Sequence, residues 1–180
     1  MDFISVREKS GLNILKDLGI ENGIVVLDPV FLKSKEEWLK MCYKPKYKSY
    51  ILVYDQENNS AIKSIALHLS KKEKKPIVAF KDLYPRSYAH YQERYAGPID
   101  FISLIAYADI VITNSFHCMA FSTIMNKSFY VIPRTHQKVN SRMRDFLQSL
   151  DISNRIIDGK QTLEKTSEID YKYVNLALSE

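Results

Sequence analysis

The chain has 180 residues, of which 46% are hydrophobic, and it carries 26 Lys and Arg against 21 Asp and Glu. A chain of this size buries ~70% of its surface on folding, which excludes a disordered protein and favours a single domain over residues 1–180. Two cysteines are too few for a disulfide scaffold, and without a secretory signal they predict a cytoplasmic location. The net charge of +5 permits an anionic ligand but does not by itself indicate nucleic acid.

Short apolar runs along the chain predict strands, because they are rich in β-branched residues and are continuous rather than alternating. Continuous runs are typical of a parallel sheet that is covered on both faces. In chain order the runs are Phe3–Val6, Ile24–Leu27, Tyr50–Val53, Ile77–Phe80, Asp109–Thr113 and Phe129–Ile132.

Helical periodicity fills the intervals between these runs. The first helix is expected to end near Gly19, and apolar residues recur at helical spacing over Ile62–Leu69, Phe101–Ile105 and Met143–Leu150. Strands that alternate with helices predict an α/β fold, a three-layer Rossmann-like domain with a mostly parallel sheet.

The most hydrophobic stretch, Phe101–Met125, is long enough to cross a membrane, but Asp109, Asn114 and His117 interrupt it. We therefore expect a buried helix, strand and helix instead of a membrane span. Peripheral contact with a membrane stays open.

Two of the predicted strands end in residues that suit an anion. The first runs into Arg7, and the fifth runs into Asn114, Ser115 and His117 at the start of a helix. With a strand order of 3-2-1-4-5-6, one strand separates the two, which places Arg7 and His117 within ~10 Å of each other. Free N–H groups at the helix start, the guanidinium of Arg7 and an acidic imidazole at His117 would together hold a small anionic ligand.

The segment Lys81–Ala96 interleaves tyrosines with cations, and Tyr84 and Arg86 are its strongest candidates for ligand contacts. It is open to three interpretations: an ordinary loop, a lid over a sugar or donor, or a nucleic-acid surface. No glycine-rich dinucleotide or P-loop motif and no zinc-type spacing of Cys and His occurs in the sequence, so no cofactor or metal is predicted.

Several segments together resemble the polysaccharide pyruvyl transferase family. They are Ile4–Glu8, Leu27–Val30, Gly97–Phe101, Ile112–His117 and Asn140–Met143, and the resemblance covers residues 1 to about 157. It implies one half of a GT-B-like enzyme that transfers pyruvate from phosphoenolpyruvate to two sugar hydroxyls as a ketal, in exopolysaccharide or capsular polysaccharide biosynthesis. The acceptor would be a sugar or a lipid-linked oligosaccharide.

By position, the resemblance assigns catalysis to His117 and Arg7, and substrate binding to Ser115, Asn114, Glu8 and Arg142. The family usually has Gly where this chain has Cys118, and its chains are about twice as long, so an N-terminal half is expected to be missing. A binding half that needs a partner chain, a GT-B-like domain for a nucleotide sugar and, more weakly, a nucleic-acid-binding domain remain the alternatives. Asp28 also resembles a family position, and we interpret it as structural.

Overall fold

The computed structural model describes residues 3–80, 85–135, 140–158, 163 and 167–178. Its centre is a five-stranded sheet in the order β5-β4-β3-β6-β7, and every pairing in it is parallel. The strands are β3 (Ile51–Tyr54), β4 (Ile77–Phe80), β5 (Tyr91–Glu93), β6 (Ile110–Thr113) and β7 (Ser128–Val131). The predicted α/β fold with a mostly parallel sheet is confirmed.

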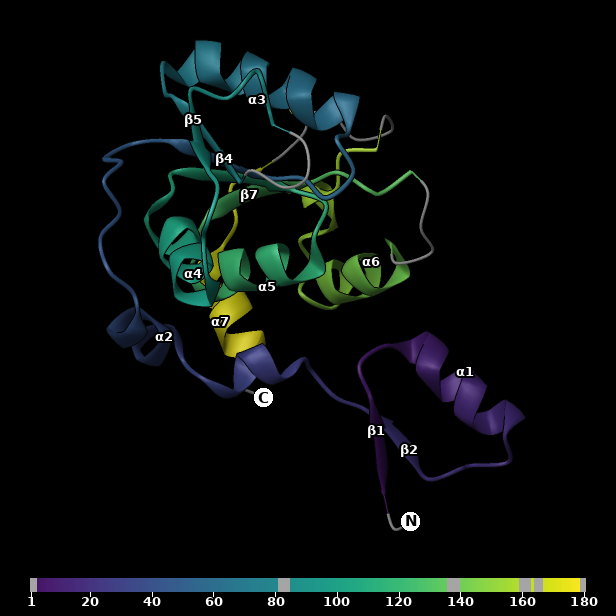
Figure 1. Cartoon of the computed structure of the whole chain (residues 1–180). Coiled ribbons are helices and arrows are strands. Elements are labelled where there is room, and N and C mark those ends of the chain that lie inside the picture. The colour runs from purple at the N-terminus through teal and green to yellow at the C-terminus, as the bar shows by residue number, and fades with distance from the viewer. Residues whose placement is uncertain (1–2, 81–84, 136–139, 159–162, 164–166, 179–180) are drawn as a thin grey trace.

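Helices cover both faces of this sheet (Figure 1). The helix α3 (Ser60–Glu73) lies on one face, and α4 (Pro98–Tyr107), α5 (Phe116–Ile124) and α6 (Asn140–Ser149) lie on the other. The shorter helices α2 (Lys35–Met41) and α7 (Tyr171–Ala177) lie on the same side as α4 and α5. Single turns of 3-10 helix occupy Pro29–Leu32 and Ser153–Arg155.

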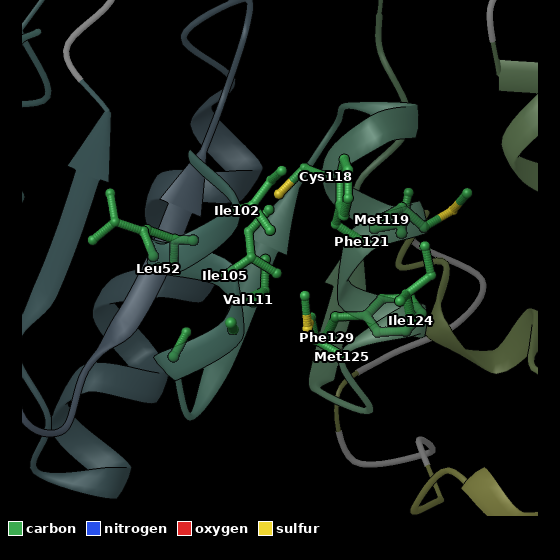
Figure 2. Close-up of a cluster of buried hydrophobic side chains, with 14 of the residues drawn as sticks. Leu52, Ile102, Ile105, Val111, Cys118, Met119, Phe121, Ile124, Met125 and Phe129 are labelled. Atoms are coloured by element: carbon green, nitrogen blue, oxygen red, sulfur yellow. The ribbon is translucent and has the colours of Figure 1, made fainter. Parts of the chain in front are cut away.

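Alternate residues of each central strand enter two different cores, because side chains on a strand point to opposite faces. Ile51 and Val53 pack in the cluster beneath α3, whereas Leu52 packs in the larger cluster beneath α4 and α5. Figure 2 shows Leu52 in that larger cluster, together with Ile105 and Met119. Burial on both faces explains why Ile51–Val53, Ile77–Ala79 and Val111–Ile112 are apolar at every position.

The hydrophobic stretch 101–125 forms most of α4, then β6, then α5, as the sequence predicts. No helix within the described part of the chain has both the length and the apolar character to cross a bilayer.

The first two strands do not join the main sheet. β1 (Ile4–Val6) and β2 (Gly23–Val25) pair in parallel as a separate two-stranded sheet, with α1 (Lys9–Asp17) between them in sequence. We call residues 3–25 the N-terminal unit; Figure 1 shows it beside the main body. The expected order 3-2-1-4-5-6 is therefore wrong. An apolar run predicts a strand without specifying the sheet in which it pairs.

The segment from 85 to 96 is partly strand. Tyr91–Glu93 forms the edge strand β5 beside β4, and the imidazole Nδ1 of His90 accepts a hydrogen bond of 3.0 Å from the Ile77 N–H. This strand was not predicted, because an edge strand with one polar side needs no apolar run.

Candidate functional site

A cavity of about 380 Å³ opens beyond the carboxyl ends of β3 and β6. The strand order reverses between these two strands, because β4 and β5 lie on one side of β3 while β6 and β7 lie on the other. Open α/β sheets bind their ligands at such a reversal. The cavity lining comprises Glu8, Gln56, Asn114, Ser115, Phe116, His117, Arg134, Arg142 and Met143.

The floor of the cavity is the turn from β6 into α5. Thr113 Oγ1 donates a hydrogen bond of 2.7 Å to the Tyr54 carbonyl and accepts one of 3.0 Å from the Ser115 N–H, which fixes this turn against β3. Ser115 is the N-cap of α5, but its hydroxyl makes no capping bond. The first N–H groups of α5 therefore keep the partial positive charge that favours an anion.

Asn114 is held from beneath by a buried network. Its Nδ2 donates to Asp55 Oδ1 at 2.8 Å, and its Oδ1 accepts from the Gln56 N–H at 2.9 Å. Asp55 also accepts hydrogen bonds from the N–H groups of Glu57 and Asn59. The polar side chain that ends β6 is thereby locked to the loop that follows β3.

Asp28 forms ion pairs with arginines from both the N-terminal unit and the main body. Its Oδ2 accepts hydrogen bonds from Arg7 Nη1 at 2.9 Å and from Arg142 Nη2, and it lies 3.7 Å from His117 Nε2. Its Oδ1 accepts from the Val30 N–H at 3.2 Å and caps the 3-10 turn. Burial alone would raise the pKa of this carboxyl group, but the bonds from Val30, Arg142 and Arg7 outweigh burial and hold the pKa below its usual value.

The guanidinium of Arg142 is fixed in two ways. It binds Asp28, and its central carbon lies 3.5 Å from the centroid of the Phe116 ring, which is a close cation–π contact. Arg142 Nε is buried and has no hydrogen-bond partner among the described residues. Arg134, which also lines the cavity, donates from Nε to the Asn114 carbonyl at 3.2 Å.

The structure thus brings together most of the predicted site residues. Arg7, His117 and Arg142 meet at Asp28, and Glu8, Asn114, Ser115, His117 and Arg142 line the cavity. Arg7 and His117 do approach each other, but through the loop that contains Asp28 and not through neighbouring strands of one sheet.

Of the two remaining predicted contacts, one falls outside the described residues and the other lies away from the cavity. Tyr84 falls outside the described residues. Arg86, which we predicted as a candidate ligand contact, is only 2% exposed. Its Nη2 donates to the Asp55 carbonyl, and its Nε lies 3.8 Å from Asp55 Oδ2. Arg86 supports the network beneath Asn114 and presents no guanidinium to the surface.

Sequence reasoning missed Asp28, Arg134 and Gln56 as parts of the site. The position of Asp28 directly after a predicted strand was a signal for a role in the site, although the proline that follows it also suits a structural cap. Cys118 is fully buried, which raises the pKa of its thiol to about 12 and rules it out as a nucleophile in this state.

Comparisons with known proteins define the class first. A solved structure of Methanocaldococcus jannaschii UDP-GlcNAc 2-epimerase, in complex with UDP-GlcNAc and UDP, aligns with a TM-score of 0.59 and 14% identity. The alignment covers 99% of this chain and 55% of the epimerase chain, so our chain spans about half of that protein. The spinosyn forosaminyltransferase SpnP aligns over 88% of this chain and 42% of its own, with a TM-score of 0.41 and 12% identity. The fold is Rossmann-like and resembles one half of a GT-B fold.

The family follows from the sequence itself. The family model of polysaccharide pyruvyl transferase matches residues 2–136, and the chain belongs to this transferase family. The match includes Arg7, Asp28 and His117 and ends before Arg142. No curated protein matches the chain.

Proposed function

We propose that this chain is the donor-binding part of a pyruvyl transferase, which takes pyruvate from phosphoenolpyruvate and attaches it as a ketal to a sugar of an exopolysaccharide or capsular polysaccharide. One observation carries the proposal: two guanidinium groups and an imidazole converge on a single buried carboxylate beside a cavity at the strand reversal. The family and the half-GT-B fold support it.

The donor set suits a small ligand with a phosphate and a carboxylate. A guanidinium carries five N–H donors, and Asp28 accepts one from Arg7 and one from Arg142, so each arginine retains donors for an anion. The N–H groups at the start of α5 add to this attraction. Asp28 acts as a counter-ion that keeps the cations in place before the ligand arrives.

The same groups suit the chemistry of ketal formation. His117 protonates the methylene carbon of phosphoenolpyruvate, and the oxocarbenium-like carbon that results is attacked by a first sugar hydroxyl. Arg7 and Arg142 stabilise the phosphate as its bond to this carbon breaks, and a second hydroxyl closes the ring. Of the two hydroxyl protons, one replaces the proton that His117 gave to the methyl group and the other leaves with phosphate. Glu8, at the cavity wall, is the carboxylate that takes the second hydroxyl proton and passes it to the departing phosphate.

Calorimetric titration with phosphoenolpyruvate tests the donor site. We expect binding by the wild-type chain and its loss in Arg7→Ala and His117→Ala, because each variant removes a hydrogen-bond donor next to Asp28. His68→Ala is the control, since His68 is exposed on α3, on the other side of the sheet. Equal affinity in all variants would remove the proposed donor site.

A binding part that needs further polypeptide is the second candidate, and the N-terminal unit favours it. Phe3 is 81% exposed, Leu18 69% and Ile24 52%, so this small sheet and its helix leave apolar side chains uncovered. We propose that these side chains pack against a further domain, which would face the cavity across a cleft. Release of inorganic phosphate from phosphoenolpyruvate in the presence of a sugar separates the two candidates. A chain that is active alone releases phosphate, whereas a part that needs further polypeptide binds the donor and releases none.

A further inference from the structure

A second cavity lies next to the candidate site and is lined almost entirely by apolar side chains. It measures about 550 Å³ and opens between the ends of β3 and β4, the start of α4, and the helices α2 and α5. We call it the aromatic pocket, after the rings of Trp38, Tyr54, Phe80, Phe101 and Phe121 that line it.

One hydrogen bond joins the aromatic pocket to the candidate site. Gln56, in the wall of the first cavity, donates from Nε2 to the Tyr54 hydroxyl at 3.3 Å, and Tyr54 lines the second. The two cavities therefore lie side by side along the carboxyl edge of the sheet. A group held in the aromatic pocket would lie beside a ligand at the start of α5.

The rings make one continuous apolar surface. Trp38 contacts Phe121, Phe121 contacts Phe101, and Phe101 contacts both Tyr54 and Phe80, with ring centroids between 5.0 and 6.1 Å apart. Most of these pairs meet edge to face, at 70° to 82°, and the Phe80–Phe101 pair is tilted at 45°. No parallel pair among them forms a slot for a flat base, whereas a sugar ring needs only one aromatic face against its C–H side.

The polar groups in this lining are already engaged. Trp38 Nε1 donates to the Val30 carbonyl at 3.0 Å, and the Gly97 N–H donates to Asp100 Oδ2 at 2.6 Å. No charged side chain is present in the described lining of the pocket. Against this described lining a charged phosphate would lose its hydration without compensation, which favours a neutral ring with an apolar face.

A third cavity, of about 440 Å³, supplies the polar contacts that such a ring needs at its edge. It shares Ala96 with the aromatic pocket and contains the carboxylates of Glu93 and Asp100 together with Lys46. Lys46 Nζ lies 3.1 Å from Glu93 Oε1, and the Tyr43 hydroxyl donates to Asp100. A carboxylate accepts hydrogen bonds from hydroxyls and an ammonium group donates to them, whereas an apolar wall does neither.

We propose that the aromatic pocket is the subsite for the acceptor sugar, which stacks a neutral pyranose ring on these aromatic side chains and turns its hydroxyls toward the donor cavity. This inference rests on the proposed function, because a pyruvyl transfer needs the sugar next to the donor carbon. The polar cavity beyond Ala96 then binds hydroxyls at the other edge of the same ring.

Trp38 is the only tryptophan of the chain and lines the pocket, so its fluorescence reports what enters. Methyl β-D-galactopyranoside and methyl β-D-glucopyranoside serve as neutral probes at millimolar concentrations, and uridine serves as the nucleoside probe. Met41→Glu places a charge at the pocket wall, and Leu67→Glu places the same charge on α3; the two parent side chains are 46% and 43% exposed. Both variants are also titrated with phosphoenolpyruvate by calorimetry.

We expect a pyranoside to change Trp38 emission, with the dissociation constant raised about tenfold or more by Met41→Glu and unchanged by Leu67→Glu. No response to either pyranoside, equal effects of the two variants, or a response to uridine alone would overturn the subsite. Phosphoenolpyruvate binding without pyranoside binding overturns the subsite and leaves the donor site standing. Pyranoside binding without phosphoenolpyruvate binding supports the pocket as a sugar site and overturns the donor assignment.

Discussion

Replacing Arg142 by lysine separates the role of charge at the candidate site from the role of a fixed guanidinium. The side chain of Arg142 is 17% exposed, and its guanidinium binds Asp28 and stacks on Phe116. Lysine keeps the positive charge but lacks the planar fork and the flat surface for stacking. The variant therefore removes the planar hydrogen-bonding group and its stacking on Phe116, and it leaves the net charge of the site unchanged.

The expected loss follows from these contacts. One charge-assisted hydrogen bond contributes about 1.5–3 kcal/mol, which corresponds to a 10- to 150-fold weaker affinity for phosphoenolpyruvate. Arg144→Lys is the matched control, because Arg144 lies on the same helix, is 48% exposed and pairs with Asp158 at 3.0 Å. Calorimetry at one fixed ionic strength measures both variants, with circular dichroism to check that each is folded.

A result within about threefold of the wild type for Arg142→Lys would show that charge alone holds the donor. Equal losses in both variants would refute the argument more directly, since Arg144 lies outside the cavity lining. The first outcome would leave residue 142 in the donor site as a positive charge only, and the second would remove it from the site. In both cases the stacking on Phe116 would be a packing contact only.

Three further predictions concern stability and reactivity. Arg86→Leu leaves the Asp55 carboxylate buried without its partner guanidinium. We expect it to lower the free energy of unfolding by about 3 kcal/mol in urea titrations, with partial recovery when Asp55→Asn is added. A loss below about 1 kcal/mol would contradict this. The pKa of Asp28 is lowered from 3.8, so its ion pairs stabilise the fold above that pH and are lost as the pH falls through the pKa of the folded state. Asp28→Asn should therefore destabilise the chain at neutral pH but not in strong acid. A difference in stability that does not change with pH would contradict this. A thiol reagent at neutral pH should modify the partly exposed Cys42 and spare the buried Cys118 until the chain unfolds, and equal rates would show that the core opens readily.

The central sheet was predictable because its strands obey one strong rule. A strand covered on both faces must be apolar at each position, and Ile51–Val53 and Val111–Ile112 satisfy this. The same rule failed for Ile24 and Val25, which form a strand of equal apolar character whose side chains are about half exposed. The apolar composition of a segment predicts a strand whose side chains are buried, but it does not predict which element they pack against.

The candidate site was predictable in part for a different reason. His117 and Asn114 are local features of a strand-to-helix turn, so sequence alone places them beside a helix N-terminus. The role of Asp28 depends on Arg142, which lies 114 residues further along the chain, and the burial of Arg86 depends on Asp55, 31 residues away. Pairs of this kind are set by the fold, and no local pattern signals them.

The two oxygens of Asp28 explain how a structural cap and a functional residue can be the same group. Oδ1 fixes the 3-10 turn through the Val30 N–H, and Oδ2 binds Arg7 of the N-terminal unit and Arg142 of the main body. The side chain of Arg7 is 52% exposed and that of Asp28 is 3% exposed, so a half-exposed guanidinium binds a buried carboxylate that the Val30 N–H also holds. Arg7 reaches Asp28 from the N-terminal unit, so its place in the proposed donor site depends on how that unit lies against this loop. A further domain that covers the apolar side chains of the unit, as proposed above, would therefore also affect how Arg7 is held and, through Arg7, the affinity for the proposed donor.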